Sequence, residues 1–276
     1  MDMNSPSGGT ERIGKSNPSK DARGDLVLTG IRSLDQKLGM EMSSRKGLPQ
    51  GSLILVRYPS ETVIPTLFIQ RILLNWAQNS DNVIFYVHSS RPYSHILNSF
   101  NAYEWDVKPF EGKNWYFENM FDLSSSSMAS SLKLGKIEVK RKTYVKKIID
   151  RMLHVKENQK KQCFSVFDDL LWMKEDRLDE DSNALITFLK GTIMSLTKIG
   201  GVHFFLLPQD VLDSVAERII MNAAQGIFDF SRSTVGSKIK DTFAITKLMG
   251  VAYVSENFDL TPSESEGFKI ESTAKI

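Results

Sequence analysis

Apolar and polar positions form two kinds of pattern along the chain. Short runs that are almost entirely apolar are typical of strands buried on both faces of a sheet. Longer stretches with an apolar residue at every third or fourth position predict amphipathic helices. The strands expected on this basis are residues 52–57, 82–88, 163–167 and 203–207. The expected helices are residues 31–38, 66–79, 92–102, 145–155, 182–199 and 211–224.

The two patterns alternate until Gly226. This alternation predicts an α/β fold with a doubly wound, mainly parallel sheet that is flanked by helices. After Gly226 the helical patterns stop, and strands with short connections predict a C-terminal antiparallel extension of the sheet. The strands expected there are residues 227–231, 241–248, 252–258 and 267–271, with turns at 235–237 and 261–263.

The ends of the folded region follow from local composition. Residues 1–24 are rich in Ser, Gly, Pro and Lys and have almost no apolar periodicity, so they are expected to form a disordered tail. Residues 25–276 are then expected to form one domain. Within it, the Ser-rich stretch 124–131 is of low complexity and predicts a mobile loop.

Overall composition narrows the class of protein without indicating a function. The chain has 276 residues, 41% of them hydrophobic and 25% charged, with a formal net charge of +2. These values exclude a wholly disordered chain and a collagen-like fibre. The one cysteine, Cys163, allows no intrachain disulfide and fits a reducing compartment. Because there is no secretory signal pattern and no apolar run near 20 residues, we expect a soluble cytoplasmic protein with no membrane partner.

Both ends of the folded region carry motifs that resemble a known family. The first reads TGIRSLDQKLG, then GLPQGSLILV and, after an altered turn, TLFIQRILLNWAQ; the last reads FAITKLMGVAYVSENFDLTPSESEGFKIES. These stretches resemble the opening and closing motifs of the KaiC-like branch of the RecA superfamily of P-loop ATPases. The resemblance covers residues 25–272 and implies a RecA-like fold. It also suggests an archaeal source, because this branch is frequent in archaea.

The resemblance fails at the loop that would bind nucleotide. In the family, glycine N–H groups surround the phosphates, a Lys contacts them, and a Thr or Ser hydroxyl binds Mg²⁺. Here two of the glycine positions hold Tyr58 and Val63, Ile64 replaces the Lys, and Pro65 replaces the hydroxyl. Glu61 adds a negative charge where a polyphosphate would lie. The whole degenerate P-loop comprises Tyr58, Pro59, Ser60, Glu61, Thr62, Val63, Ile64 and Pro65.

Two further family positions are also substituted. Where the family usually carries a pair of glutamates, one of which activates water, this chain has His88 and Ser89. A histidine at the end of a strand more often forms a hydrogen bond to a neighbouring group than acts as a catalytic base. A catalytic base would also need a bound phosphate to act on. The family's closing KLRG motif, which contacts the nucleotide of the adjacent subunit, reads here from Lys247 to Gly250 with Met249 in place of the arginine. Lys247 itself and Asp168, at the Walker-B position, are kept.

Joint loss of the lysine, the catalytic acid and the arginine points to one interpretation. All three act on the same phosphate, so the chain is expected to be a pseudo-ATPase with no catalytic residues, no metal and no cofactor. Its role would then be that of a regulatory or scaffold protein, for example in signal transduction. Its partner would be another protein, such as an active KaiC-like or RadA-like ATPase. Without a shared nucleotide site, a monomer or small oligomer is expected.

Two other functions remain open from the sequence. In the first, Ser60, Thr62, Asp168 and Lys247 serve an atypical ATPase that binds ATP and Mg²⁺ through the altered loop. In the second, a RadA-like paralogue binds single-stranded nucleic acid through the basic stretch 133–147, where Tyr144 could stack on a base. The cations considered there are Lys136, Lys140, Arg141, Lys142, Lys146 and Lys147. A charge run on an amphipathic helix is more often only its solvent-exposed face.

Overall fold

The computed structural model describes residues 26–39, 46–121, 135–170, 182–263 and 267–273. Within this part, the side chains of residues 135–140 and 182–186 are left undescribed. The tail predicted at 1–24 and the loop predicted at 124–131 both lie outside the described residues. The structure therefore tests neither of these two predictions.

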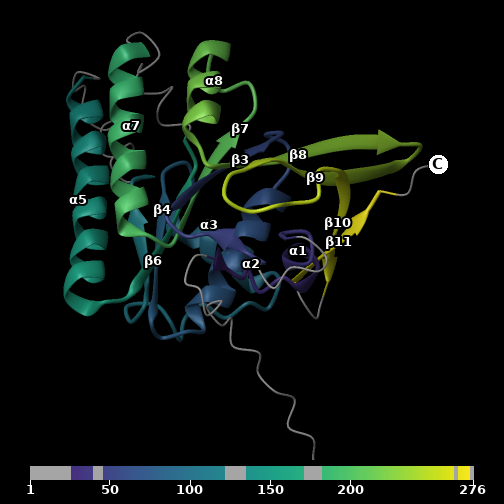
Figure 1. Ribbon diagram of the computed structural model, residues 1–276, viewed down its shortest axis with the longest axis horizontal. Helices are drawn as coiled ribbons and strands as arrows, with labels where there is room; N and C mark the ends of the chain where they lie inside the picture. The colour runs from purple at the N-terminus through teal and green to yellow at the C-terminus, as the bar shows by residue number, and fades with distance from the viewer. Residues whose placement is uncertain (1–25, 40–45, 122–134, 171–181, 264–266, 274–276) are drawn as a thin grey trace, which may run out of the picture.

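A nine-stranded sheet organises the described residues, in the order β11-β10-β9-β8-β3-β7-β6-β4-β5 (Figure 1). The strands from β8 to β5 are parallel, whereas β8, β9, β10 and β11 pair antiparallel. This arrangement confirms the predicted α/β fold with its C-terminal antiparallel extension. The bounds are β3 (Ser52–Tyr58), β4 (Asn82–His88), β5 (Trp115–Asn119), β6 (Gln162–Asp168), β7 (Val202–Pro208), β8 (Gly226–Val235), β9 (Lys238–Leu248), β10 (Asn257–Ser263) and β11 (Gly267–Ser272). A separate pair joins β1 (Leu26–Val27) to β2 (Leu48–Pro49).

Helices cover both faces of the parallel part of the sheet. On one face lie α1 (Arg32–Asp35), α2 (Ile64–Ala77) and α3 (Tyr93–Asn101). On the other lie α5 (Gly135–Gln159), α7 (Ser182–Ile199) and α8 (Ser214–Ala223), which stand side by side in Figure 1. Among the helices of the described part, none combines the length and the apolar character needed to cross a membrane.

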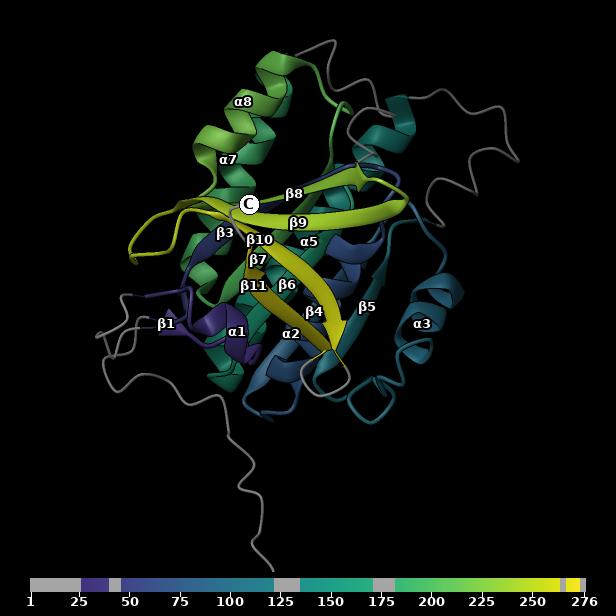
Figure 2. The same ribbon diagram turned by 90° about the vertical axis from the view of Figure 1, so that its right-hand side faces the viewer.

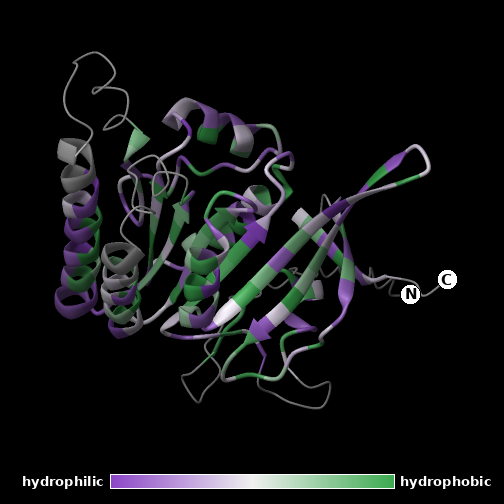
Figure 3. Ribbon diagram, turned by 90° about the horizontal axis from the view of Figure 1, so that it is seen from above, coloured by the Kyte–Doolittle hydropathy of each residue, from purple (hydrophilic) through white to green (hydrophobic). Residues whose placement is uncertain are grey.

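Two apolar cores fill the space between the sheet and its helices. Alternate residues of a strand point to opposite faces, so β3 sends Ile54 and Val56 to the first core and Leu53 and Leu55 to the second. The first core includes Trp76 of α2, which is fully buried and packs its ring against two phenylalanines of the strands. Figure 3 shows the strands as mainly hydrophobic ribbons in the centre of the molecule. Burial on both faces explains why these strands read as continuous apolar runs.

The structure differs from the predicted fold in three places. The strand β5 was not predicted, because its five residues, WYFEN, are too few to show a clear period. The strand predicted at 252–258 is wrong: Val251, Tyr253 and Val254 lie outside the strands and pack against the first core from a loop. The turn predicted at 261–263 is also wrong, because these residues belong to β10. Pro262 is tolerated there because β10 pairs with β9 only over residues 257–259.

Candidate functional site

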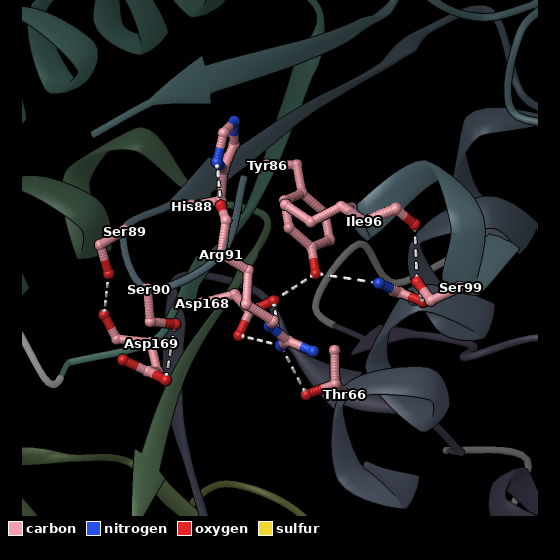
Figure 4. Close-up of polar contacts among 11 residues, drawn as sticks. Thr66, Tyr86, His88, Ser89, Ser90, Arg91, Ile96, Ser99, Asp168 and Asp169 are labelled. Carbon is pink, nitrogen blue, oxygen red and sulfur yellow. Dashed lines mark hydrogen bonds and ion pairs between the residues drawn. The ribbon is translucent and has the colours of Figure 1, made fainter. Parts of the chain in front are cut away.

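The candidate site lies where β3, β4 and β6 end, at the carboxyl edge of the parallel strands. Ligands of open α/β sheets bind at this edge, because the loops that follow the strands meet there. The last residues of the three strands are Tyr58, His88 and Asp168. Since β4 and β6 are neighbours with His88 opposite Asp168, the segments after both strands lie side by side (Figure 4).

Asp168 is neutralised from within the chain. Its carboxylate is fully buried and accepts hydrogen bonds at 2.7 Å on both oxygens from Nη2 of Arg91. Arg91 follows the end of β4 by three residues, and the same Nη2 also donates to the hydroxyl of Thr66 at 3.1 Å. Thr66 lies in the first turn of α2, directly after the altered loop. One guanidinium thus joins the ends of β4 and β6 to the start of α2 (Figure 4).

A tyrosine completes the shell around the same carboxylate. The Tyr86 hydroxyl donates to Oδ2 of Asp168 at 2.5 Å and accepts from the Gln70 amide at 3.0 Å. Ser99 on α3 in turn donates to the carbonyl oxygen of that amide at 3.0 Å. Asp168 therefore receives donors from β4 and from the loop after it, while α2 and α3 hold those donors in place.

The protonation states in this network follow from burial and charge. Burial, followed by the nearby charge of Asp168, raises the pKa of Tyr86 well above its usual value, so its hydroxyl remains a donor. Burial lowers the pKa of Arg91, but the charge of Asp168, the hydrogen bond to it and the charges of Tyr86 and Tyr58 together outweigh that effect and raise the pKa overall. Burial, Asp169 and Asp168 likewise raise the pKa of Tyr58. The network thus keeps the Arg91 guanidinium charged beside Asp168 and the Tyr86 hydroxyl protonated as a donor.

The other residues after β4 and β6 bind one another. The Ser89 hydroxyl donates to the Asp169 carbonyl at 2.7 Å, and the Ser90 hydroxyl donates to the Asp169 carboxylate at 2.9 Å. The peptide bond between Asp168 and Asp169 is cis. His88 is buried, and its Nδ1 lies 3.0 Å from the Arg91 carbonyl oxygen, to which it donates. His88 is therefore held by a neighbouring backbone group in the way expected of a strand-end histidine.

The altered loop has the conformation of an ordinary turn. Anion-binding nests of backbone N–H groups need residues in the left-handed region, and no residue from Tyr58 to Pro65 has a positive φ. The Thr62 N–H donates to the Pro59 carbonyl at 3.2 Å, and the Ile64 N–H donates to the Thr62 hydroxyl at 3.3 Å. Pro59 and Pro65 have no N–H at all. These four backbone positions therefore offer no donor to a phosphate group.

Side chains fix the loop further. Tyr58 is 5% exposed and Ile64 packs partly buried against the first core. Arg232 on β8 donates to the Glu61 carbonyl and to the Thr62 hydroxyl, both at 2.9 Å, while an ion pair with Asp241 holds Arg232 itself. Ser60 and Glu61 are exposed, and Val63 is 60% exposed. The loop is thus closed by contacts within the chain.

The lysine of the closing motif contacts helix α8 of the same chain. The Lys247 ammonium donates to the Met221 and Asn222 carbonyls at 3.0 and 3.1 Å. These carbonyls lie in the last turn of α8, where a cation also complements the helix dipole. Met249, at the position of the family's arginine, is 58% exposed. Neither side chain takes part in the network around Asp168.

Two residues of the basic stretch that the nucleic-acid hypothesis uses are engaged within the chain. Arg141 is 2% exposed, and Tyr144 donates to Glu118 at 3.1 Å, so neither is presented to a base or a phosphate. Their positions explain this, because 141, 145, 148, 149 and 152 share one face of α5 and that face is buried. Lys146 and Lys147 are exposed and Lys142 is half-buried. The side chains of Lys136 and Lys140 lie outside the described residues.

Several residues of the network were not predicted from the sequence. These residues match no sequence motif: they are Arg91, Tyr86, Gln70, Ser99 and Thr66. One signal could have found Arg91: it follows a buried strand, as Asp168 does, and the carboxyl ends of neighbouring parallel strands meet at one edge. The adjacency of β4 and β6, which that inference needs, is a matter of strand order and is not visible in the sequence.

Comparisons with known proteins support the fold. No protein-family model matches this chain, and no curated protein matches it. Among solved structures, the chain is similar to a KaiC-like protein from the hyperthermophilic archaeon Pyrococcus horikoshii OT3, with a TM-score of 0.62. The match covers 89% of this chain and 98% of that one at 13% sequence identity. At this identity the likeness shows a shared fold and not a shared activity.

Proposed function

We propose that this chain, which has the fold of KaiC-like proteins, is a non-catalytic pseudo-ATPase that acts as a regulatory or scaffold protein through contacts with other proteins. The observation that carries the proposal is the state of Asp168. A Walker-B carboxylate must be available to the hydration shell of Mg²⁺. Here both of its oxygens are engaged by Arg91 and one also by Tyr86.

Arg91 supplies the positive charge that a metal ion would otherwise supply. A fully buried carboxylate is costly unless a cation and hydrogen bonds compensate its charge, and Arg91 with Tyr86 provides both. Mg²⁺ would have to displace a guanidinium that is also bonded to Thr66. The residues present therefore do not fit a Mg²⁺–nucleotide complex, and we assign them no catalytic step.

The altered loop supports the same proposal independently. Phosphate binding at a strand-to-helix loop depends on convergent backbone N–H groups and a lysine. This loop has two prolines, two N–H groups that bond within it, and Ile64 in place of the lysine. The exposed carboxylate of Glu61 would repel a polyphosphate. An atypical ATPase built on Ser60 and Thr62 is thus disfavoured, because Thr62 already accepts from Ile64 and Arg232.

Phosphate release from ATP tests the absence of catalysis. The purified chain is assayed with Mg²⁺ beside Asp168→Asn, a variant that would disable any metal-dependent hydrolysis at this site. We expect both proteins to release phosphate at the same background rate. Release by the unaltered chain that exceeds the background and disappears in Asp168→Asn would show a working ATPase.

A further inference from the structure

The β8–β9 hairpin extends beyond the sheet, and the end of the hairpin is exposed on both faces. β8 pairs with β3 only as far as Asp229, and β9 pairs with β10 only from Thr242 onward. From there to the turn at Gly236 the two strands pair only with each other. Figures 1 and 3 show this ribbon projecting away from the helices, and Figure 2 shows it in front of the sheet. Exposed positions at its end include Val235 and Ile239, at 64% and 66%.

One face of this hairpin can be traced from its base to its tip. Paired residues of antiparallel strands share a face, and alternate residues of one strand do as well. Asp229 opposite Ala244 and Ser231 opposite Thr242 therefore lie on the same face as Val235 opposite Lys238. Ile239 lies on the other face. Six residues of extended strand separate Asp229 from Val235 by ~20 Å.

The base of this face is acidic. It forms part of a pocket of about 340 Å³ that is lined by side chains from β3, β8, β9, β10, α8 and the segment after β7. Arg57 bonds Glu217 at 2.8 Å and Asp229 at 2.9 Å, and the exposed Asp210 is the third carboxylate of the lining. Burial raises the pKa of Asp229, Arg57 lowers it and Glu217 raises it again. One guanidinium thus pairs with two carboxylates, and a third carboxylate lines the same pocket.

The tip of the same face is basic. Lys238 is exposed beside Val235. Lys240 is the next residue of β9 on this face toward the base, and it pairs with Asp259 at 2.8 Å. Between base and tip, Ser231 and Ser233 are exposed, and their short side chains leave the ribbon open to a close approach. The face therefore carries opposite charges at its two ends with small polar residues in between.

We propose that two copies of this chain pair through this face, stacked with their hairpins pointing in opposite directions. Such a two-fold arrangement is self-complementary, because residue i of one copy meets residue j of the other and the reverse. It places each Lys238 and Val235 over the acidic pocket of the other copy. Each copy then relieves the excess negative charge at Asp210, Glu217 and Asp229. The interface is separate from the Asp168 network and does not depend on the proposed loss of catalysis.

Sedimentation of the full chain, from about 1 to about 300 µM, tests this pairing. The unaltered chain is expected to shift from monomer to dimer with concentration, and the dimer is expected to weaken as salt rises. Lys238→Glu places like charges together and is expected to weaken the dimer at least about tenfold. The matched control is Ile239→Ser, which removes the most exposed aliphatic side chain from the opposite face and is expected to change the affinity less than about twofold.

A charge exchange makes the test specific. Asp210→Lys alone is expected to weaken the dimer as Lys238→Glu does, whereas a mixture of the two variants should form a heterodimer near the original affinity. In that heterodimer the introduced glutamate meets the introduced lysine on one side, and the retained Lys238 meets the retained Asp210 on the other. The proposal is overturned if the unaltered chain stays monomeric, if it assembles beyond two copies, if Ile239→Ser acts as strongly as Lys238→Glu, or if the mixture does not pair.

Discussion

Arg91 does for Asp168 what a bound cation would do in a metal-dependent enzyme. Its Nη2 reaches both carboxylate oxygens and Thr66, so a single side chain holds the ends of two strands against the start of α2. A carboxylate kept without exposure to solvent needs such a partner. The residue that most resembles the family's site is thus part of the internal structure of this chain.

Replacing Arg91 with methionine measures this contribution. Arg91→Met leaves the Asp168 charge buried with only Tyr86 as a donor, so the free energy of unfolding should fall by about 3 kcal/mol. Urea denaturation followed by circular dichroism gives the value. The double variant Arg91→Met with Asp168→Asn should recover part of the loss, because no unpaired charge remains. A loss below about 1 kcal/mol in the single variant would contradict the assigned role.

His203 provides a pH-dependent counterpart within the core. It is fully buried, its Nδ1 accepts from Ser165 at 2.9 Å, and its Nε2 donates to the Gly200 carbonyl at 2.8 Å. Burial lowers its pKa to about 4, against 6.5 in the unfolded chain. Between these values only the unfolded state binds the proton, so stability falls as the pH falls.

His203→Gln isolates this effect, because its amide does not titrate. The free energy of unfolding of the unaltered chain, relative to that of His203→Gln, should fall by about 3 kcal/mol between pH 7 and pH 4. Above pH 7 the difference should be constant. The measurement is a set of denaturant titrations at each pH. A difference that does not change with pH would show that His203 binds a proton as readily in the folded state as in the unfolded chain.

At the scale of elements, the strands and helices with long, regular patterns were predictable. The apolar runs of β3, β4, β6 and β7 and the helical periodicity over the 18 residues of α7 are strong local signals, and the structure contains all of them. Elements whose form depends on distant partners were not predictable from the sequence. β5 is short and is stabilised by its pairing with β4, and β10 contains a proline that only its limited pairing with β9 allows.

The same contrast holds for side chains of the candidate site. The changes from Tyr58 to Pro65 can be identified from the sequence because the flanking motifs fix the register. The Arg91 network cannot, because its members meet only after β4 and β6 pair. Arg141 was placed in a basic surface from its charge, although its helical spacing from Val145 puts it on the buried face of α5. Spacing was the better guide there than residue type.

The connection between α7 and β7 carries the strictest demand for glycine. Gly201 has φ +71°, and a Cβ on it would lie 1.9 Å from the Cys163 carbonyl oxygen. Gly112 has a similar φ of +75° with nothing within 4 Å of such a Cβ. Gly201→Ala and Gly112→Ala therefore share the same backbone cost of ~1–2 kcal/mol and differ in the clash.

Thermal unfolding of the two glycine variants separates these effects. Gly112→Ala should lower the free energy of unfolding by ~1–2 kcal/mol, whereas Gly201→Ala should lose more than about 4 kcal/mol or fail to fold. Equal losses in the two variants would mean that β7 can move away from β6 at this point. That result would contradict the tight packing described for the centre of the sheet.

At the scale of the whole molecule, contacts within the chain close the candidate site. The fold of KaiC-like proteins is present over 89% of the chain. The loop, the Walker-B aspartate and the closing lysine each bind other parts of the same chain. The proposed scaffold role would use the outer surfaces of this fold, and the proposed pairing would use its hairpin.

Calorimetric titration of ATP with Mg²⁺ into the full chain tests the central claim most directly. Because Arg91 occupies the carboxylate and four backbone positions of the loop offer no N–H to a phosphate, we predict no saturable heat up to about 1 mM nucleotide, which corresponds to a binding free energy weaker than about 4 kcal/mol. Micromolar binding that requires Mg²⁺ and is lost in Asp168→Asn would contradict the account.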